Sequence, residues 1–340
     1  MKKILNKEYF IGIDISKDTL DLSLIHGATY GTFKDKKIKN SFDGFEQMYN
    51  WLKKQGVESE QCVFCMEHTG TYGLLLFAWL SQMELDYCVE PGLKIKRSLG
   101  LTRGKNDKVD ARRLADYAYT NKAKLEVFEL PSTLLIQIKQ FLTYREQLVK
   151  IKTSLKNSLK SHKTYQKVSG ISTIPNEIQE QIESQEKRIH QIEHQIIELI
   201  KTDSEMKKNY ELATSVKGIG FVIAAFMLVT TNNFSGFENG RKYACYSGIA
   251  PFEYTSGSSI QGRTKVSNLG NKKIKALLSN GANSACRYDP EIRAYYKRKE
   301  AEGKDHKLII NAISCKLVNR VFATIKRQTP YVTFQQQNYA

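Results

Sequence analysis

An apolar stretch near the start of the chain carries an acidic residue in its interior. Residues 9–18 read Tyr-Phe-Ile-Gly-Ile-Asp-Ile-Ser-Lys-Asp, with Asp14 among the apolar side chains. A second apolar run follows at 19–25 after a short polar turn, so the pattern predicts two adjacent strands. Because an unpaired buried carboxylate costs several kcal/mol, we expect Asp14 to meet a cation, a metal ion or hydrogen-bond donors. Taken alone, the pattern equally fits an aspartate that forms a turn or caps a helix.

The segments after this pair alternate between strand and helix patterns. Gly27-Ala28 suits a hairpin turn, and Ser41 suits a helix N-cap. The resulting order is βββαβαβα, which is the order of an RNase H-like α/β fold. After the first two strands, the predicted elements are a strand at 30–38, a helix at 42–54, a strand at 61–67, a helix from 72, a strand at 86–90 and a helix after 92.

Three further acids follow in similar settings. Glu67 ends the fourth predicted strand, and active sites in such sheets gather at the carboxyl ends of strands, where Asp14 also falls. Asp107 and Asp110 stand at the start of an amphipathic helix, and their i, i+3 spacing places them on one face. Four carboxylates of this kind suit two Mg²⁺ or Mn²⁺ ions that act in phosphoryl transfer. Capping of the positive helix end is the alternative for Asp107 and Asp110.

The chain is strongly basic. Its net charge of +17 and its pI near 9.4 favour a polyanionic partner such as nucleic acid, although a generally basic, soluble surface is the alternative. Residues 241–330 hold 18 Lys and Arg against 6 Asp and Glu, and so carry +12 of the total. The basic residues that we expect to contact nucleic acid are Lys105, Lys108, Arg112, Arg241, Lys242, Arg263, Lys265, Lys272 and Lys273.

Composition and cysteine usage narrow the class of protein. With 340 residues, 41% of them hydrophobic, the chain is long enough for two domains with cores. No apolar run reaches the roughly 18 residues of a membrane span, and no signal-peptide core precedes the first strand, so we expect a cytoplasmic protein without a membrane partner. Cys62 and Cys65 lack a second pair at zinc-site spacing and are predicted to be buried thiols. His190 and His194 share a helix face without a third ligand, which favours a solvated surface over a metal site.

The middle of the chain, residues 129–209, has the pattern of two long helices. One apolar seam runs from Leu134 to Leu159, interrupted by Arg145 and Lys152, and another runs from Ile182 to Met206. The stretch 169–175 between them contains Gly and Pro and cannot continue a helix, so an antiparallel coiled-coil hairpin is predicted. This hairpin would separate a domain at 1–128 from another at 210–340. It could mediate dimerisation or be self-contained, and the sequence is consistent with both.

The C-terminal region, residues 210–340, is predicted to be mainly helical. Residues 212–226 have the pattern of a helix-hairpin-helix, whose turn at Gly218 and Gly220 could approach a phosphate or could be a tight turn between packed helices. Ser256 lies in a small loop rich in Ser and Gly with cations around it, and a basic helix opens after Gly270. A loop of this kind suits a phosphodiester backbone, although Ser256 could also be an ordinary turn residue.

These motifs resemble those of the DEDD-type transposases of the insertion sequence 110 family. The matching segments are Gly-Ile-Asp14-Ile-Ser-Lys, Met-Glu67-His-Thr-Gly-Thr-Tyr and Lys-Asn-Asp107-Lys-Val-Asp110-Ala, in the family's order. Asn106 departs from the Thr or Ser of the family pattern, at a position that is not a presumed ligand. A Ser-Gly motif after an Ala-Pro turn extends the similarity into the C-terminal domain, so that it covers roughly residues 8–330.

The resemblance implies a DNA transposase or recombinase with a RuvC-like N-terminal domain. It implies that Asp14, Glu67, Asp107 and Asp110 bind Mg²⁺ or Mn²⁺ and that Ser256 is the nucleophile, with Ser258 and Ser259 close by. The implied partners are double-stranded donor and target DNA, a noncoding bridge RNA, and further copies of the chain in a dimer or tetramer. The alternatives are a junction-resolving nuclease that joins no strands and a non-catalytic nucleic-acid-binding protein.

Overall fold

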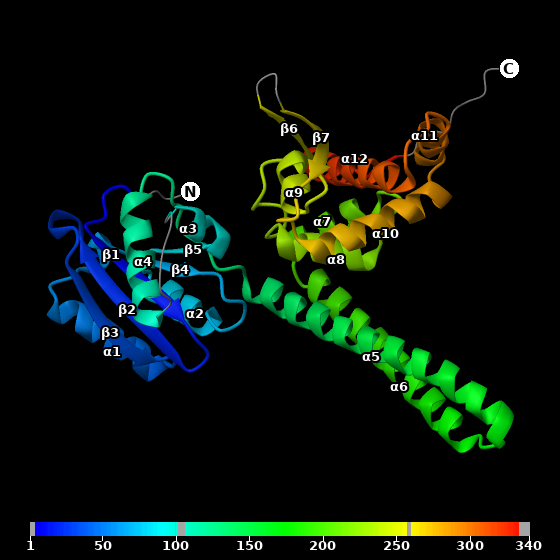
Figure 1. The fold of residues 1–340 in the computed structure, drawn as a ribbon, viewed down its shortest axis with the longest axis horizontal. Helices are drawn as coiled ribbons and strands as arrows, with labels where there is room; N and C mark the ends of the chain where they lie inside the picture. Colours follow the sequence, from blue (N-terminus) through cyan, green and yellow to red (C-terminus); the bar gives the residue numbers. More distant parts are fainter. Residues whose placement is uncertain (1–3, 99, 101–105, 257–259, 333–340) are drawn as a thin grey trace. The chain divides into compact units, whose positions relative to one another are not determined.

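The structure is a computed structural model, which describes residues 4–98, 100, 106–256 and 260–332. It divides into two compact units, Met1–Leu130 and Pro131–Ala340 (Figure 1). The predicted βββαβαβα order of the N-terminal region is confirmed. The long helical hairpin, predicted as a separate segment, groups with the C-terminal helices in the second unit.

The N-terminal unit is built on a five-stranded mixed sheet with the strand order β3-β2-β1-β4-β5. The central strand β1 pairs antiparallel with β2 and parallel with β4, and β4 pairs parallel with β5. The edge strand β3 pairs antiparallel with β2. The strands are β1 (Tyr9–Ile15), β2 (Thr19–His26), β3 (Phe33–Lys39), β4 (Cys62–Glu67) and β5 (Tyr87–Glu90).

Helices cover both faces of this sheet (Figure 1). Alternate side chains of each strand point to opposite faces, and the two hydrophobic clusters follow that alternation. One cluster joins Ile11 and Ile13 to α1 and α2, and the other joins Phe10 to α3 and α4. These helices are α1 (Phe42–Lys54), α2 (Leu74–Gln82), α3 (Gly92–Ser98) and α4 (Asp107–Thr120).

Local signals explain most element boundaries in this unit. The Ser41 hydroxyl accepts a hydrogen bond from the Gly44 amide, so the predicted N-cap of α1 is confirmed. The third strand begins at Phe33 rather than at the predicted residue 30. The reason is the longer connection, in which a short 3-10 turn at Gly27–Thr29 precedes Gly31 in the left-handed region (φ 98°).

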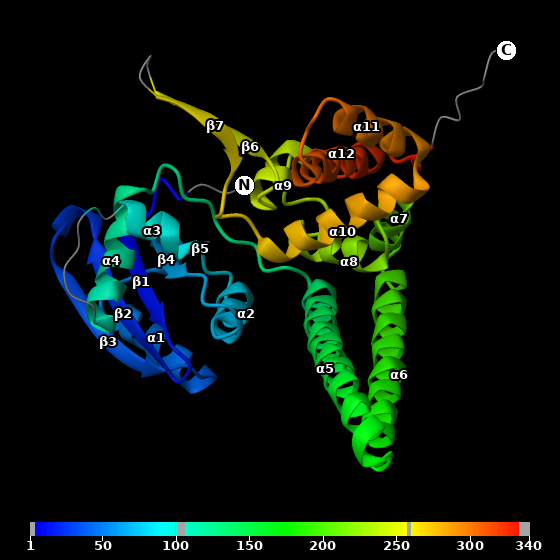
Figure 2. The same cartoon turned by 45° about the vertical axis from the view of Figure 1, so that its right-hand side comes forward.

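The second unit begins with the predicted hairpin, α5 (Thr133–Ser169) and α6 (Thr173–Lys201), whose helices run side by side (Figure 2). Gly170 ends α5 in the left-handed conformation (φ 75°), and Pro175 lies in the first turn of α6, where proline is tolerated. The two charged interruptions of the α5 seam find partners on α6. Arg145 binds Glu193 at 2.6 Å, and Lys152 lies 3.6 Å from Glu186.

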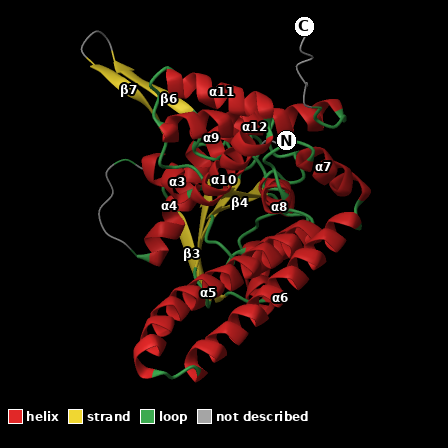
Figure 3. Ribbon diagram, turned by 90° about the vertical axis from the view of Figure 1, so that its right-hand side faces the viewer, coloured by secondary structure: helices red, strands yellow, loops and turns green. Residues whose placement is uncertain are grey.

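In the described residues of the second unit, further helices and a β-hairpin follow the α5–α6 hairpin (Figure 3). They are α7 (Ser204–Thr214), α8 (Phe221–Thr230), α9 (Gly240–Tyr246), β6 (Pro251–Ser256), β7 (Ile260–Val266), α10 (Lys272–Tyr288), α11 (Pro290–Ala301) and α12 (His306–Arg327). By length and composition alone, α12 could cross a membrane. Its side chains Ile313, Leu317 and Val321 are fully buried in the core of this unit, so α12 is a core helix.

The predicted glycine turn between α7 and α8 packs against another helix. Gly218 has a positive φ of 95°, and a Cβ atom at this position would lie 2.6 Å from the carbonyl oxygen of Gly281 on α10. Two roles were considered for Gly218, a turn that approaches a phosphate and a tight turn between packed helices. The contact with Gly281 matches the second. Gly220 is different, because a Cβ atom there would meet nothing within 4 Å.

Candidate active site

Two of the predicted acids lie at neighbouring strand ends on one face of the N-terminal sheet. In the parallel β1–β4 pair, Ile13 stands opposite Met66, so the residues that follow, Asp14 and Glu67, come next to each other at the carboxyl edge. Both alternate with residues buried in the clusters on the opposite face, and both are half-buried. The sheet therefore presents Asp14 and Glu67 on the face that α4 covers.

The other two acids are delivered by α4, which sits directly on β1 at Gly12. A Cβ atom at Gly12 would lie 2.0 Å from the Ala111 carbonyl oxygen and 2.3 Å from the Ala115 amide nitrogen. Only glycine permits this contact, because the backbone atoms of a packed helix cannot give way by that much. The close approach brings the first turn of α4, with Asp107 and Asp110, to the end of β1.

The start of α4 is fixed by a side-chain cap. The Asn106 side chain accepts a hydrogen bond from the Lys108 amide at 3.0 Å, so α4 begins at Asp107. Asp107 is exposed, whereas the partly buried Asp110 is held by Arg113, whose Nη1 lies 2.8 Å from its carboxylate. The predicted helix start is confirmed, and each acid is in the first turn, where the helix dipole favours negative charge.

The charges of the neighbouring acids act on Asp14. Burial, followed by the charges of Asp110, Asp107, Asp21 and Glu67, raises the pKa of Asp14 to about 6. Negative charge is therefore concentrated around Asp14, as a cation-binding site requires.

Asp21 and Lys37 belong to the same neighbourhood, and both were missed in the sequence. Lys37 Nζ lies 2.9 Å from the Asp21 carboxylate and 4.0 Å from that of Asp107, and the hydrogen bond to Asp21 together with these charges raises the pKa of Lys37. The available signal was the alternation of β2 and β3, which places Asp21 and Lys37 opposite each other in register. Lys37 thus offsets part of the repulsion among the acids.

Glu67 is positioned by a second close glycine contact. A Cβ atom at Gly92, the first residue of α3, would lie 1.9 Å from Oε1 of Glu67. Here the obstructed atom is the end of a flexible side chain, so a larger residue would displace the Glu67 carboxylate rather than the backbone. The small size of Gly92 therefore leaves room for the observed position of Glu67.

The acids have the donor chemistry for a hard divalent cation. Carboxylate oxygens are the ligands that Mg²⁺ and Mn²⁺ prefer. The pKa of Asp14 is raised first by burial and then by repulsion from neighbouring acids, and a bound cation would relieve that repulsion. In the described part of the chain, however, no three His, Cys, Asp or Glu side chains are close enough together to hold a metal ion. Metal binding at this site would thus require the carboxylates to move closer together.

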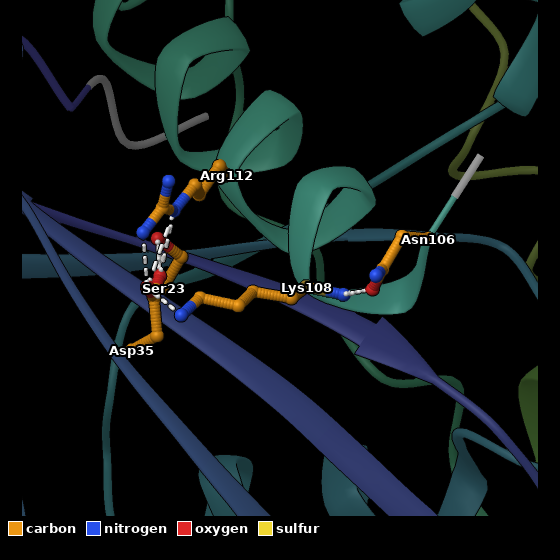
Figure 4. Close-up of polar contacts among 5 residues, drawn as sticks. All are labelled: Ser23, Asp35, Asn106, Lys108 and Arg112. Atoms are coloured by element: carbon orange, nitrogen blue, oxygen red, sulfur yellow. Dashed lines mark hydrogen bonds and ion pairs between the residues drawn. The ribbon is translucent and has the colours of Figure 1, made fainter. Parts of the chain in front are cut away.

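The predicted basic contacts in the N-terminal unit have partners within the protein. Lys108 Nζ lies 3.1 Å from the Asp35 carboxylate, and Nε of Arg112 donates to the same carboxylate at 3.1 Å (Figure 4). Lys105 lies outside the described residues. Lys108 and Arg112 therefore connect α4 to β3.

In the C-terminal unit, most of the basic residues that were predicted to contact nucleic acid are exposed, whereas Lys273 has partners within the protein. Arg241, Lys265 and Lys272 are exposed, and Lys242 is exposed beside Glu238 at 2.8 Å. The side chain of Arg263 lies outside the described part.

Lys273 is placed differently from its neighbour Lys272. It forms a salt bridge with Glu146 of α5, and its Nζ lies 4.5 Å from the centre of the Phe226 ring. Burial, with the nearby charge of Arg145, lowers its pKa. Lys273 thus connects three helices of its own unit.

Ser256 is the last residue of β6, and its backbone pairs with Ile260 of β7. The sequence predicted a loop around Ser256, whereas the described residues on either side, up to Ser256 and from Ile260 on, form paired strands. The side chain of Ser256 and the residues Ser258 and Ser259 lie outside the described part of the structure.

The remaining candidate ligands behave as expected from the sequence. Cys62 and Cys65 are buried, and burial raises the pKa of the Cys62 thiol to about 11, which makes it unreactive. His190 and His194 are exposed on α6. Both predictions are confirmed.

Comparisons with known proteins agree with the order of these motifs. Residues 11–164 match a DEDD-type IS110 family model described as a transposase, and residues 210–297 match one described as "Transposase IS116/IS110/IS902 family". The chain is 29% identical over 327 residues to the "Pilin gene-inverting protein" of Moraxella bovis, covering 95% of this chain and 97% of that protein. It is also 32% identical over 118 residues to the "Insertion element IS110 uncharacterized 43.6 kDa protein" of Streptomyces coelicolor, covering 35% of this chain and 29% of that protein.

The two family models describe the same group of transposases and match this chain in both of its units. The similarity to the pilin gene-inverting protein also extends over nearly the full length of both chains. The chain therefore belongs to the IS110 family of transposases, and it is a DNA recombinase.

Proposed function

We propose that this recombinase cuts and rejoins mobile-element and target DNA with an acidic, metal-dependent site and a serine nucleophile. The observation that carries the proposal is the grouping of Glu67, Asp107 and Asp110 around Asp14 at the carboxyl edge of the sheet. The strand order β3-β2-β1-β4-β5 supports an RNase H-like, RuvC-like assignment for this unit.

In this proposal the four carboxylates act as oxygen ligands for Mg²⁺ or Mn²⁺. The bound ion would supply positive charge at the phosphate that undergoes transfer. Asp14 and Glu67 come from strand ends, and Asp107 and Asp110 come from one helix turn, so the ligands are held by regular elements rather than by loops. The half-buried position of Asp14 limits its exposure to competing water.

Ser256 is the proposed nucleophile. Its hydroxyl oxygen would form a bond to a DNA phosphorus atom while the bond from that phosphorus to a sugar oxygen breaks. The serine loses a proton, the departing sugar oxygen gains one, and the phosphoserine linkage retains the bond energy needed for rejoining. The place of Ser256 at the carboxyl end of β6 agrees with the position of the Ser-Gly motif from which the proposal starts.

The name of one relative supports strand joining. "Pilin gene-inverting protein" says that the Moraxella protein inverts a gene, and inversion requires both cutting and rejoining of DNA. This observation favours a recombinase over the alternative of a junction-resolving nuclease.

The proposed partners are double-stranded donor and target DNA, a noncoding bridge RNA and further copies of the chain. The exposed cations Arg241, Lys265 and Lys272 support binding to a polyanion. A pull-down of the protein from its host, followed by sequencing of bound RNA, tests the bridge RNA. Recovery of only unspecific cellular RNA would contradict that part of the proposal.

The experiment that tests the chemistry is a trapped reaction. The protein, its DNA and any bound RNA are incubated with Mg²⁺, denatured, and analysed by mass spectrometry for a protein-DNA adduct. We expect an adduct on Ser256 that is lost in Ser256→Ala and in Asp14→Asn. An adduct on another residue, or strand joining that survives Ser256→Ala, would overturn the serine assignment and favour the nuclease.

A further inference from the structure

The edge strand β3 contacts the beginning of α4 through three alternate side chains. Phe33, Asp35 and Lys37 point to the same face of the sheet. The Arg112 guanidinium lies 5.4 Å from the centre of the Phe33 ring, and the same guanidinium binds Asp35. Lys37 Nζ lies 4.0 Å from the Asp107 carboxylate. The side chains on one face of β3 thus contact the first two turns of α4.

Asp35 forms the centre of these contacts (Figure 4). Its carboxylate accepts hydrogen bonds from Arg112, through Nε at 3.1 Å and also through Nη2. Lys108 Nζ lies 3.1 Å away, and the Ser23 hydroxyl donates at 2.9 Å. The Asp35 side chain is only 14% exposed, so its charge depends on these partners rather than on water.

The two cations that Asp35 binds are interleaved with the acids of α4. Lys108 and Arg112 are four residues apart, and Asp107 and Asp110 lie within the same two turns. Gly12 and the buried side chains of α4 hold the middle of the helix on the sheet, so the rotation that remains to be fixed is that of its first turn about the helix axis. Two anchors to one carboxylate on a neighbouring strand resist that rotation.

We infer that Asp35 is a positioning residue, which fixes the rotation of α4 through Lys108 and Arg112 and so directs Asp107 and Asp110 toward Asp14. This inference rests on the proposed metal site and adds a requirement for it. Asp35 acts through the two cations rather than as a ligand. Outer residues that orient ligands typically change metal affinity by about 10- to 100-fold when they are replaced.

The test measures metal binding without DNA. The full-length protein is titrated with Mn²⁺, and the rise in melting temperature gives the half-saturating concentration. Asp35→Asn keeps the size of the side chain and removes its charge. We expect its half-saturating Mn²⁺ concentration to increase by about 10-fold or more.

The matched control removes another acid of similar burial from the same unit. Asp86 lies 2.7 Å from Lys7, and the two side chains are 8% and 10% exposed. Asp86 precedes β5 and is therefore at the amino edge of the parallel strands, opposite the edge of Asp14 and Glu67. Asp86→Asn should lower the melting temperature while leaving the half-saturating Mn²⁺ concentration unchanged.

A second variant keeps the test decisive if Asp35→Asn does not fold. Arg112→Lys retains the positive charge but cannot make the two-pronged contact with Asp35, so the half-saturating concentration should again increase. The inference is overturned if Asp35→Asn is destabilised like Asp86→Asn but has the half-saturating Mn²⁺ concentration of the parent. The same result for Arg112→Lys counts in its place if Asp35→Asn does not fold. Asp35 would then have a structural role only.

The same titration separates this failure from failure of the proposed function. Asp14→Asn removes a presumed ligand and should abolish the Mn²⁺-dependent rise. A parent protein with no rise, or a rise that persists in Asp14→Asn, would overturn the metal site together with the role of Asp35. A response that is lost in Asp14→Asn and unchanged in Asp35→Asn would overturn the role of Asp35 alone.

Discussion

The acids of the N-terminal unit and the cations of the C-terminal unit are held in different ways. A single added carbon would collide with a neighbour at Gly12, two residues before Asp14, and at Gly92, beside the Glu67 carboxylate. In addition, α4 is tied to β3 by ion pairs. Arg241 and Lys272 are exposed on helices, where long side chains move freely. Ligands of a metal need accurate placement, whereas phosphate contacts act over longer distances. Substitutions around the acids of the N-terminal unit are therefore expected to cause large losses of activity. Substitutions of the exposed cations of the C-terminal unit are expected to weaken DNA binding by small steps.

The largest effect is expected for Asp14→Asn. Recombination should fall by about 10³-fold or more, because the proposed metal site would lose a ligand and its charge. The free energy of unfolding of the metal-free protein should stay equal or increase by about 1 kcal/mol, because the substitution removes a carboxylate that the fold keeps in an unfavourable, repulsive environment. A recombination assay and urea unfolding measure the two quantities. Recombination at the parent rate would refute the role of Asp14.

Gly92→Ala is expected to separate activity from stability. The new methyl group must displace Glu67, so activity should fall by about 100-fold, the scale of a misplacement of about 1 Å. The backbone is not in the left-handed region, and alanine is a better helix former than glycine, so the melting temperature should not fall. Gly27→Ala is the control, since its nearest neighbour would be 3.4 Å away, an ordinary contact. Equal activity in the two variants would contradict the positioning of Glu67 by Gly92.

The pH dependence of stability gives an intermediate effect. Burial and the neighbouring acids raise the folded-state pKa of Asp14 to about 6, from an ordinary value of 3.8, so the folded protein binds this proton more tightly than the unfolded chain does. The contribution of Asp14 is therefore most favourable below pH 4 and is lost as the pH rises through 6. Urea unfolding of metal-free protein between pH 4 and pH 7 measures this loss. Asp14→Asn should remove it, and an unchanged pH dependence in that variant would contradict the assignment.

The smallest effects are expected for two adjacent lysines. Lys272→Gln should weaken DNA binding and lower the salt slope by about one unit, because one phosphate contact is lost. Lys273→Met should instead reduce the free energy of unfolding by about 1 kcal/mol through loss of the Glu146 salt bridge. Binding assays at several salt concentrations and urea unfolding separate the two. If the two variants change the salt slope of DNA binding and the free energy of unfolding equally, Lys272 and Lys273 do not differ in the way described.

The sequence predicted the frame of the N-terminal unit well. The alternation of apolar residues located the strands, Ser41 located the start of α1, and the carboxyl ends of β1 and β4 located Asp14 and Glu67. Periodicity carries this information because it depends on residues that are neighbours in the chain. The long hairpin and the boundary at Gly170 were predicted for the same reason.

Contacts between distant segments could not be predicted in this way. Nothing local in the sequence indicates that Gly12 receives the backbone of α4 or that Asp35 binds Lys108 and Arg112. Lys108, Arg112 and Lys273 looked like surface cations available to a phosphate, and in the structure each has an acidic partner from another element. The charge of a side chain can be read from the sequence, but its partner depends on the tertiary fold.

The seating of α4 on Gly12 also bears on how the chain is made. All five strands have been synthesised by Glu90, but Asp107 and Asp110 emerge later, on a helix that must return to the first strand across most of the unit. Closing such a long loop is slow compared with local pairing. On the ribosome, the sheet would hence exist with only half of its acids until α4 has emerged and docked. With the four acids acting together as proposed, the acidic site of a nascent chain would be incomplete until α4 has docked, and Ser256 would be synthesised later still.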